Sequence, residues 1–345
     1  MLSPGLLSAQ AYFAHADWAA ACDQTRTCTA LALPPIDAER GMRLTLLRGG
    51  GPREEVAWID LFPEEGVPVE GSAILFADEE PLLSLGAAHM PVDGIAEGRA
   101  DLLRITGREE LERLLAALRR ARRLVLVSGG RPLGEVSAEG ASAVFLWIDE
   151  RQLRLHGENA LVRRGEIPAH EIPEPPPAPR LPRRAGAEQI EGERAARAIT
   201  AARALLPEGW CEPLTPEERS DRAFLLADRR TILVGLDCAR GFHNQVSRWF
   251  LVRGAEATPL RLRRPAIDRT EGRLVRVEAL NNAQFHPLTG ELVDYEKARA
   301  LGDCGRFTVF RFDGEGFALA EDRHLTLCRG ASPDQWPLLW SSLPD

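Results

Sequence analysis

Two short segments of the sequence place several polar side chains beside a cysteine, and chemistry would be sought there first. Residues 237–244 hold an Asp, an Arg, a His and an Asn around one cysteine, and residues 302–305 hold Asp303 and a cysteine between two glycines. Carboxylate, imidazole and amide groups of this kind bind polar ligands or move protons. Asp, Asn and Gly are also typical of turns, so turn and disulfide geometry is the alternative interpretation.

The familiar catalytic motifs are incomplete or absent in this sequence. A Gly-x-Ser-x-Gly elbow starts at Gly140 and Ser142, but Val144 stands where the second glycine belongs. Lys297 is the one lysine, which excludes a Gly-Lys-Ser/Thr phosphate loop and a Ser-x-x-Lys pair. The seven histidines are scattered, without the Cys/His spacing of a metal site. We therefore expect no metal and no cofactor, and favour a non-catalytic function.

The cysteines predict a disulfide framework. There are six of them: Cys22, Cys28, Cys211, Cys238, Cys304 and Cys328. Their even number allows complete pairing, and their spacing favours three local pairs, each formed by consecutive cysteines of the chain. Free thiols in the cytosol are the alternative. Three disulfides indicate an oxidising compartment, so we predict a periplasmic or secreted protein.

Composition and length narrow the class of protein further. The chain has 345 residues, 44% of them apolar, and a formal net charge of −8, which argues against a nucleic-acid partner. No apolar run approaches the roughly 20 residues of a membrane helix. Residues 1–17 lack the basic and apolar segments of an export signal. We interpret them as the start of a mature form from which the signal peptide has been removed.

A proline-rich segment predicts the main boundary in the chain. Seven prolines lie within residues 168–182, and proline fixes φ and lacks an N–H donor. Such a segment is an extended, semi-rigid spacer. We therefore predict an N-terminal domain over 12–165, a linker over 166–186 and a C-terminal domain over 187–345.

Hydrophobic periodicity predicts mostly antiparallel sheets with a few helices in both domains. In the first domain we expect strands at 42–48, 56–62, 72–76 and 124–127, a helix capped at Thr106 and ending in the basic run 119–123, and a second helix over 141–148. In the second we expect a helix at 188–205 and strands at 231–236, 247–252, 274–280, 307–312 and 317–320. The predicted fold class is α+β: two domains, each a mostly antiparallel β-sheet with one or two packed helices.

Several short motifs, in order along nearly the whole chain, resemble the domain of unknown function 1176 family. They are Asp17-Trp18 with the loop 22–28, the stretch 140–165, and the segments 302–305, 316–317, 328–330 and 336–340. The resemblance implies an exported, disulfide-bonded bacterial protein without an assigned activity. The opening is also loosely similar to the invasion-associated locus B family, over the first domain only. His243 and His286 depart from the family pattern, which usually has Tyr and Asp there.

The resemblance carries seven polar residues onto this chain as ligand-binding candidates, for which loop and cap structure is the alternative interpretation. They are Asp23, Arg26, Asp149, Gln152, Arg240, Asn244 and Asp303.

The predicted function is a non-catalytic binding or inhibitor-like protein of the envelope. Its partner would be an envelope protein or a cell-wall component. One alternative is an envelope hydrolase, which predicts that Asp149 meets His243, Asn244 or Asp303 in a cleft. The other is a structural partner in an envelope assembly, which predicts a large exposed apolar patch.

Overall fold

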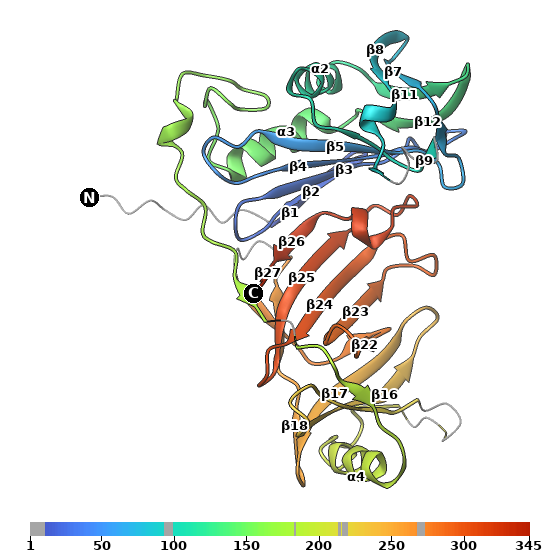
Figure 1. Ribbon diagram of the computed structural model, residues 1–345, viewed down its shortest axis with the longest axis vertical. Helices are drawn as coiled ribbons and strands as arrows, with labels where there is room; N and C mark the ends of the chain where they lie inside the picture. Colours follow the sequence, from blue (N-terminus) through green and yellow to red (C-terminus); the bar gives the residue numbers. More distant parts are fainter. Residues whose placement is uncertain (1–10, 93–98, 183, 213–214, 216–219, 268–272) are drawn as a thin grey trace. The chain divides into compact units, whose positions relative to one another are not determined.

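A computed structural model describes residues 11–92, 99–182, 184–212, 215, 220–267 and 273–345. The chain divides into two compact units (Figure 1): residues 1–177 with 325–339, and residues 178–324 with 340–345. Strands far outnumber helices, and several sheets are antiparallel. The mostly antiparallel β structure is therefore confirmed, whereas the predicted linker and domain boundaries stay predictions.

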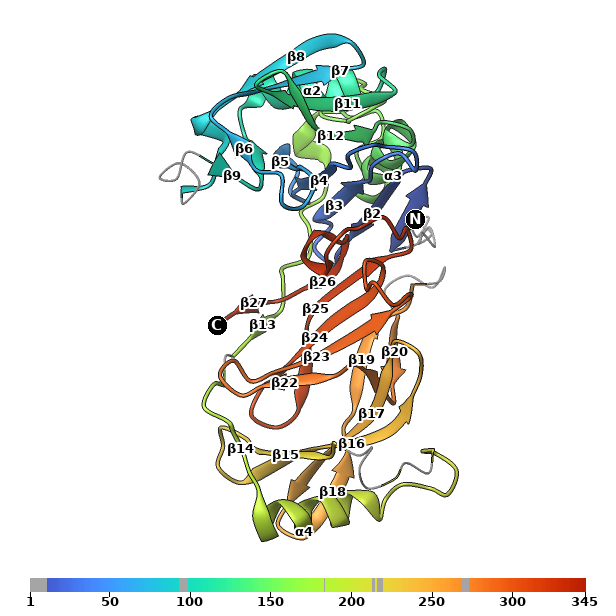
Figure 2. The ribbon, with the colours of Figure 1, turned by 90° about the vertical axis from the view of Figure 1, so that its right-hand side faces the viewer.

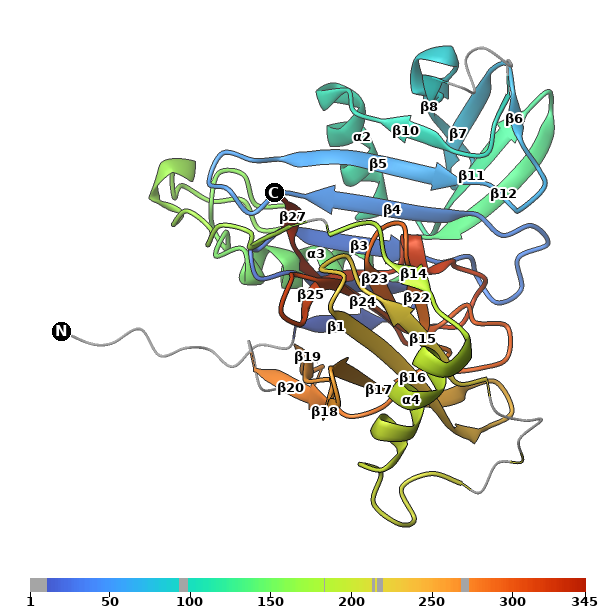
Figure 3. The ribbon, with the colours of Figure 1, turned by 60° about the horizontal axis from the view of Figure 1, so that its bottom comes forward.

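The first unit is built on a six-stranded sheet in which each strand pairs antiparallel with the next (Figure 3). In spatial order its strands are β1 (Tyr12–His15), β2 (Trp18–Cys22), β3 (Cys28–Ala32), β4 (Arg43–Arg48), β5 (Val56–Phe62) and β10 (Leu103–Ile105). Cys22 and Cys28 are directly opposite in the β2–β3 register. Their disulfide closes this hairpin, as predicted.

Within the described ranges, two helices and a second sheet complete the first unit. The sheet has the order β12 (Arg131–Ser137), β11 (Arg123–Ser128), β7 (Ala73–Ala77) and β8 (Glu80–Leu85), and β6 (Val69–Glu70) pairs with β9 (Arg99–Ala100). Helix α3 (Ala141–Arg151) contacts β1 and β2, where Trp18 meets Phe145 edge to face. Helix α2 (Arg108–Leu118) buries Leu111, Leu114, Leu115 and Leu118, the predicted apolar face. Short 3₁₀ helices lie at Ala87–His89 (η1), Ala169–Glu171 (η2) and Pro333–Gln335 (η4).

The predicted ends of helix α2 are wrong at both termini. Gly107 is the N-cap, in an extended conformation and without a side-chain cap, so the Thr106 hydroxyl lies one residue outside the capping position. The helix ends at Leu118 with Arg119 as C-cap, and Arg123 already belongs to β11. The basic run is therefore a short connection between helix and strand.

The second unit contains two larger sheets. One has the order β14 (Glu188–Gln189), β15 (Arg222–Leu225), β16 (Thr231–Arg240), β17 (Gln245–Arg253) and β18 (Glu256–Pro259), with β21 (Leu280–Asn281) also on β17. Helix α4 (Gly192–Arg203) packs small alanines onto this sheet. The other, visible in Figure 2, has the order β22 (Gln284–His286), β23 (Glu291–Lys297), β24 (Gly305–Phe312), β25 (Phe317–Leu325) and β26 (Leu338–Ser341).

Two short pairings belong to the second unit as well. They are β19 (Leu262–Pro265) with β20 (Leu274–Val277), and β13 (Arg180–Leu181) with β27 (Leu343–Pro344). The strand predicted at 274–280 is split, because Val277 pairs with Leu262 whereas Leu280 pairs with Ser247 in a different sheet. The helix predicted from residue 188 starts at Gly192, because Glu188 and Gln189 pair with β15.

All six cysteines are oxidised. The predicted pairs Cys22–Cys28 and Cys211–Cys238 are confirmed, and Cys304 and Cys328 are disulfide-bonded too. Within the described ranges, no helix is long and apolar enough to cross a membrane.

Candidate functional site

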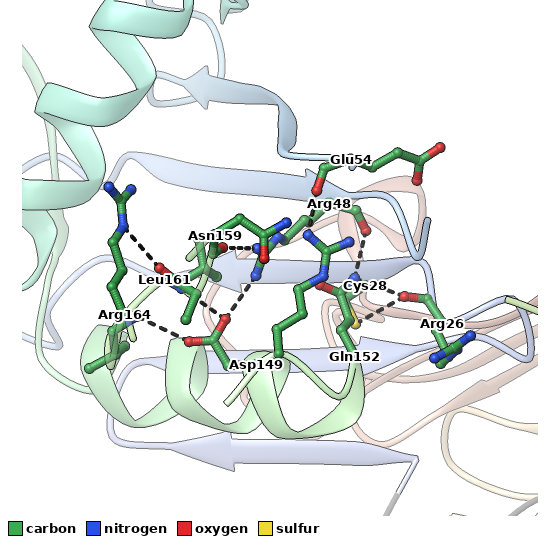
Figure 4. A network of polar contacts seen from close by, with 12 residues as sticks. Arg26, Cys28, Arg48, Glu54, Asp149, Gln152, Asn159, Leu161 and Arg164 are labelled. Atoms are coloured by element: carbon green, nitrogen blue, oxygen red, sulfur yellow. Dashed lines mark hydrogen bonds and ion pairs between the residues drawn. The ribbon is translucent and has the colours of Figure 1, made fainter. Parts of the chain in front are cut away.

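A buried ion pair lies between the end of β4 and helix α3 in the first unit. Arg48 is 1% exposed and Asp149 is fully buried. The Arg48 Nη1 donates to Asp149 Oδ1 at 2.8 Å, and its Nη2 donates to the backbone oxygen of Asn159 (Figure 4). Burial lowers the pKa of Arg48, an effect that the carboxylate of Asp149 opposes. The alternation of β4 places Leu44, Leu46 and Arg48 on one buried face, so the strand pattern contained a signal for this buried charge.

The Asp149 carboxylate also fixes the loop that follows α3. Its Oδ1 accepts the backbone N–H of Leu161 at 2.8 Å, and its Oδ2 accepts that of Val162 at 3.0 Å. Each oxygen therefore has at least one strong donor, and the residue holds the loop against the sheet. Asp149, a predicted ligand-binding candidate, supports neighbouring groups with its carboxylate, and its part in ligand binding stays a prediction.

Gln152 and Arg154 tie the glycine turn between β4 and β5 to the same helix. The Gln152 Nε2 donates to the backbone oxygens of Arg26, Arg48 and Gly49, at 2.8, 3.2 and 3.0 Å. The buried Arg154 donates to those of Gly49, Gly51 and Glu54. Burial lowers the pKa of Arg154 to about 10. Gly50 is required here, because a Cβ would lie 2.1 Å from the Thr25 oxygen.

Asp23 and Arg26 shape the loop that the Cys22–Cys28 disulfide closes. The Asp23 Oδ1 accepts the backbone N–H of Thr25 at 2.8 Å and that of Thr27 at 3.1 Å. Arg26 adopts a positive φ of 58° and donates from Nη2 to the Pro173 oxygen at 2.6 Å. Arg26, Asp149 and Gln152 thus share one network, in which the first contributes its carbonyl group and the others their side chains.

A cavity of about 720 Å³ lies next to this network, against the outer side of Arg48. Its apolar wall is formed by Val56, Leu111, Leu115 and Leu161, from β5, α2 and the loop that Asp149 holds. The polar and charged lining residues are Arg48, Arg53, Glu55, Thr106, Arg108, Glu112, Glu158, Asn159, Arg164 and His170, with Ala169 beside them. The sequence did not predict this cavity, because the residues that line it lie in four separate segments of the chain and show no common spacing.

The acidic side chains of the cavity already have partners. Glu55 and Glu112 both pair with Arg108, at 3.1 and 3.5 Å. Glu158 accepts the backbone N–H of Ala169 at 3.0 Å.

The cationic side chains of the cavity are less completely engaged. Arg53 contacts no acceptor among the residues that the structure describes. Arg164 donates from Nε to the Ala160 oxygen at 3.2 Å, and no carboxylate within the described ranges pairs with its terminal nitrogens. Within the described ranges, these are the two arginines of the lining that have no carboxylate partner.

The other three candidates belong to the second unit. Asn244 donates to the Lys297 oxygen at 2.9 Å and accepts from Asn282 Nδ2 at 2.7 Å. Arg299 donates to both carboxylate oxygens of Asp303, from Nε at 2.6 Å and from Nη2 at 2.5 Å.

Arg240 lies at the end of β16, 3.9 Å from the buried Asp237. The seven candidates therefore do not form one cluster within either unit. Turn and ion-pair contacts are common to these residues, and their part in ligand binding stays a prediction.

The second unit also buries a cluster of ions. Arg306 donates to both oxygens of the fully buried Asp322, at 3.0 and 2.7 Å. Arg264 pairs with the fully buried Asp294 at 2.8 Å. Burial raises the pKa of Asp294 to about 6 and lowers that of His324 to about 4.

Comparison with known proteins places the chain in a class without a known activity. Residues 12–342 match the family described as "Protein of unknown function (DUF1176)", so the chain belongs to this family and the resemblance is confirmed. The chain is similar to YpfG, an uncharacterised protein of Escherichia coli strain K12, at 27% identity over 348 residues, covering 96% of this chain and 93% of that protein. No solved structure matches it. Its function must therefore be argued from its own geometry.

Proposed function

We propose that the chain is an exported, non-catalytic binding protein of the bacterial envelope, and that the cavity beside Arg48 is its ligand pocket. The ligand class that fits is an amphipathic anion, in which a carboxylate or phosphate is joined to an apolar group. The observation that carries the proposal is the pairing of an apolar wall with two under-used guanidinium groups. A cavity of about 720 Å³ is within the usual size range of small-molecule sites.

The arginines of the pocket are the reason for proposing that the ligand carries a negative charge. A guanidinium group offers a planar pair of N–H donors that matches carboxylate and phosphate oxygens. Arg53 and Arg164 have such donors to spare, whereas all three acidic side chains of the lining are engaged. Arg48 lies behind them with its charge compensated by Asp149, so it supports the pocket without adding net charge.

The apolar side of the pocket supports the hydrocarbon part. Leu111 and Leu115 lie on one face of α2, and Val56 and Leu161 face the same cavity. An aliphatic chain placed there would gain roughly 0.8 kcal/mol for each buried methylene group. A free inorganic anion would forgo this contribution.

Export is supported by the three disulfides, which persist in oxidising compartments. Fractionation of a producing bacterium, with thiol counting on the denatured protein, tests this part. We expect the chain in the periplasmic or secreted fraction with no titratable thiol. Six thiols would contradict export.

Calorimetric titration with matched ligands tests the pocket. Laurate and lauryl phosphate share a tail, lauryl alcohol removes the charge, and acetate removes the tail. We expect one or both anionic amphiphiles to bind at least about tenfold more tightly than the alcohol and acetate.

Substitutions of the two arginines locate the binding. Arg53→Gln and Arg164→Gln should each weaken laurate or lauryl phosphate binding by about tenfold, the effect of losing one charge-assisted hydrogen bond. Arg163→Gln is the matched control, because this exposed neighbour does not line the cavity. Equal binding of the alcohol, or unchanged binding by both pocket variants, would contradict the proposal.

A further inference from the structure

The hairpin turn between β16 and β17 exposes an aromatic side chain completely. Arg240 and Gln245 are the last paired residues, and Phe242 lies in the turn with a relative exposure of 108%, the highest among the large apolar side chains described. A phenylalanine ring presents roughly 150–250 Å² of surface that gains free energy when it is buried. A turn has no structural need for such a residue, since Gly, Asn and Asp serve turns better.

We infer that this turn is a preformed anchor for a partner protein, with Phe242 entering an apolar pocket whose rim is acidic. The inference does not rest on the ligand pocket of the first unit. It concerns only contacts within the second unit, and it identifies an interaction surface that the proposed function leaves open.

The chain that follows Phe242 is held by side-chain hydrogen bonds. Asn244 Oδ1 accepts the Lys297 N–H at 3.1 Å, and its Nδ2 donates to the Lys297 oxygen at 2.9 Å. Asn282 Nδ2 donates to the oxygen of His243 at 3.2 Å. The backbone on this side of the exposed ring is therefore fixed by a neighbouring strand and loop.

The chain that precedes Phe242 is held by a covalent bond. The β16–β17 register shifts between Asp237 and Ala239, and Cys238 in this bulge is bonded to Cys211. The Glu212 N–H donates to the Cys238 oxygen at 2.8 Å, and Gln245 Nε2 donates to Asp237 Oδ2 at 2.6 Å. A loop fixed on both sides loses little conformational entropy on binding, which favours affinity.

The positive charges on the same hairpin indicate that the rim of the partner's pocket is acidic. Arg240 has a side chain that is 44% exposed, and Arg248 lies with its guanidinium 4.3 Å from the ring centre of the half-exposed Trp210. The buried Asp237 lies 3.9 Å from both Arg222 and Arg240, so one carboxylate faces two guanidinium groups beside this hairpin. Tryptophan and arginine are enriched at the energetic centres of interfaces, and positive groups select an acidic surface.

A protein pocket fits these observations better than a membrane surface. One exposed ring in a rigid turn, on a hairpin that carries arginines, matches a single concave site, whereas interfacial membrane binding uses an extended apolar face. Membrane binding is therefore a distinct outcome of the test.

The test starts with p-benzoylphenylalanine placed at position 242 of the full chain, irradiated in intact producing cells. The matched control is the same group at Leu288, which is 84% exposed in the Pro287–Gly290 turn of the same unit. We expect a discrete protein cross-link from position 242 that is absent from position 288. No cross-link above the control would overturn the inference.

Affinity then decides whether the cross-linked protein uses the turn. Against that purified protein, Phe242→Ala should weaken binding at least about 30-fold, Leu288→Ala less than about twofold, and Arg240→Glu should weaken it most at low salt. Equal affinities of the wild type and Phe242→Ala would overturn the inference. So would Phe242-dependent sedimentation with vesicles of phosphatidylethanolamine and phosphatidylglycerol.

Discussion

In the first unit, the buried carboxylate of Asp149 is shared between one guanidinium group and two backbone amides. In the second unit, Asp322 pairs with Arg306 and Asp294 pairs with Arg264, and Asp294 also accepts the backbone N–H of Asn281 at 2.6 Å. The first arrangement fixes loops, because its remaining donors reach backbone carbonyl groups. The second arrangement joins more side chains to one another, since Arg306 and Thr308 both bind Asp322, and it reaches the backbone at single points such as Pro265 and Asn281.

The two networks therefore differ in role: the first holds loops in place, and the second contains groups that change protonation in the acid range. The first unit uses buried charge to hold the glycine turn and the loop after α3, both of which border the pocket. The second unit holds Asp294 and His324, whose pKa values of about 6 and about 4 fall in the acid range. We therefore expect substitutions in the first network to affect ligand binding, and substitutions in the second to affect the response to acid.

The largest expected effect is that of Asp149→Ala. Removing this carboxylate leaves the buried Arg48 without its counter-charge, and such losses cost about 3–5 kcal/mol. Urea unfolding should show this loss of stability, and laurate or lauryl phosphate binding should weaken as the loop of Leu161 is released. Glu150→Ala, an exposed neighbour on α3, is the control and should change stability by less than about 0.5 kcal/mol.

Asp322→Ala sharpens the comparison. It should cost a similar amount of stability in the second unit, because Arg306 loses its bidentate partner. It should leave ligand affinity unchanged. A stable Asp149→Ala variant with full affinity would contradict the distinction between the two networks.

The next effect concerns the two disulfides of known pairing. Restriction of the unfolded chain grows with loop length, so Cys211–Cys238, with a separation of 27, should contribute about 3–4 kcal/mol. Cys22–Cys28, with a separation of 6, should contribute about 2–3 kcal/mol. Paired Cys→Ser variants, compared by urea unfolding, test this order, and a reversed order would show that native contacts outweigh chain entropy.

The last effect, confined to the acid range and absent at neutral pH, is a pH dependence at His324. Burial lowers its pKa to about 4 from 6.5, so between these values the unfolded chain binds a proton that the folded chain does not. Its contribution to stability therefore falls as the pH falls from 6.5 to 4. Asp294 acts in the opposite direction between pH 3.8 and 6, because its raised pKa lets the folded state hold the proton.

His324→Gln removes the first of these opposing contributions. Between pH 7.5 and pH 4 the variant should gain up to about 3 kcal/mol relative to the wild type, as followed by urea midpoints. His286→Gln at the exposed end of β22 is the control and should follow the wild type. A variant whose difference from the wild type does not change with pH would contradict the account.

The sequence predicts those parts of the fold that local patterns determine. The apolar face of α2 and the disulfide between Cys22 and Cys28 follow from spacing along one short segment. The split of the strand at 274–280 does not, because Val277 and Leu280 pair with strands of two different sheets, which local spacing cannot distinguish.

The pocket is the clearest case of what spacing could not predict. Arg53, Leu111 and Arg164 reach it from three distant segments, and nothing in their spacing links them. The family motifs indicated Asp149 and Gln152, which lie behind the pocket and support it. The family motifs thus included residues that support the proposed pocket from behind, but not the arginines that line it.

The most direct test of the ligand pocket is native mass spectrometry of the chain purified from the periplasm of a producing bacterium. The wild type should carry a bound amphipathic anion that laurate or lauryl phosphate displaces. An Arg53→Gln, Arg164→Gln double variant should lose the bound molecule, and Arg163→Gln should keep it. A wild type without bound molecules, or a double variant that retains them fully, would contradict the account.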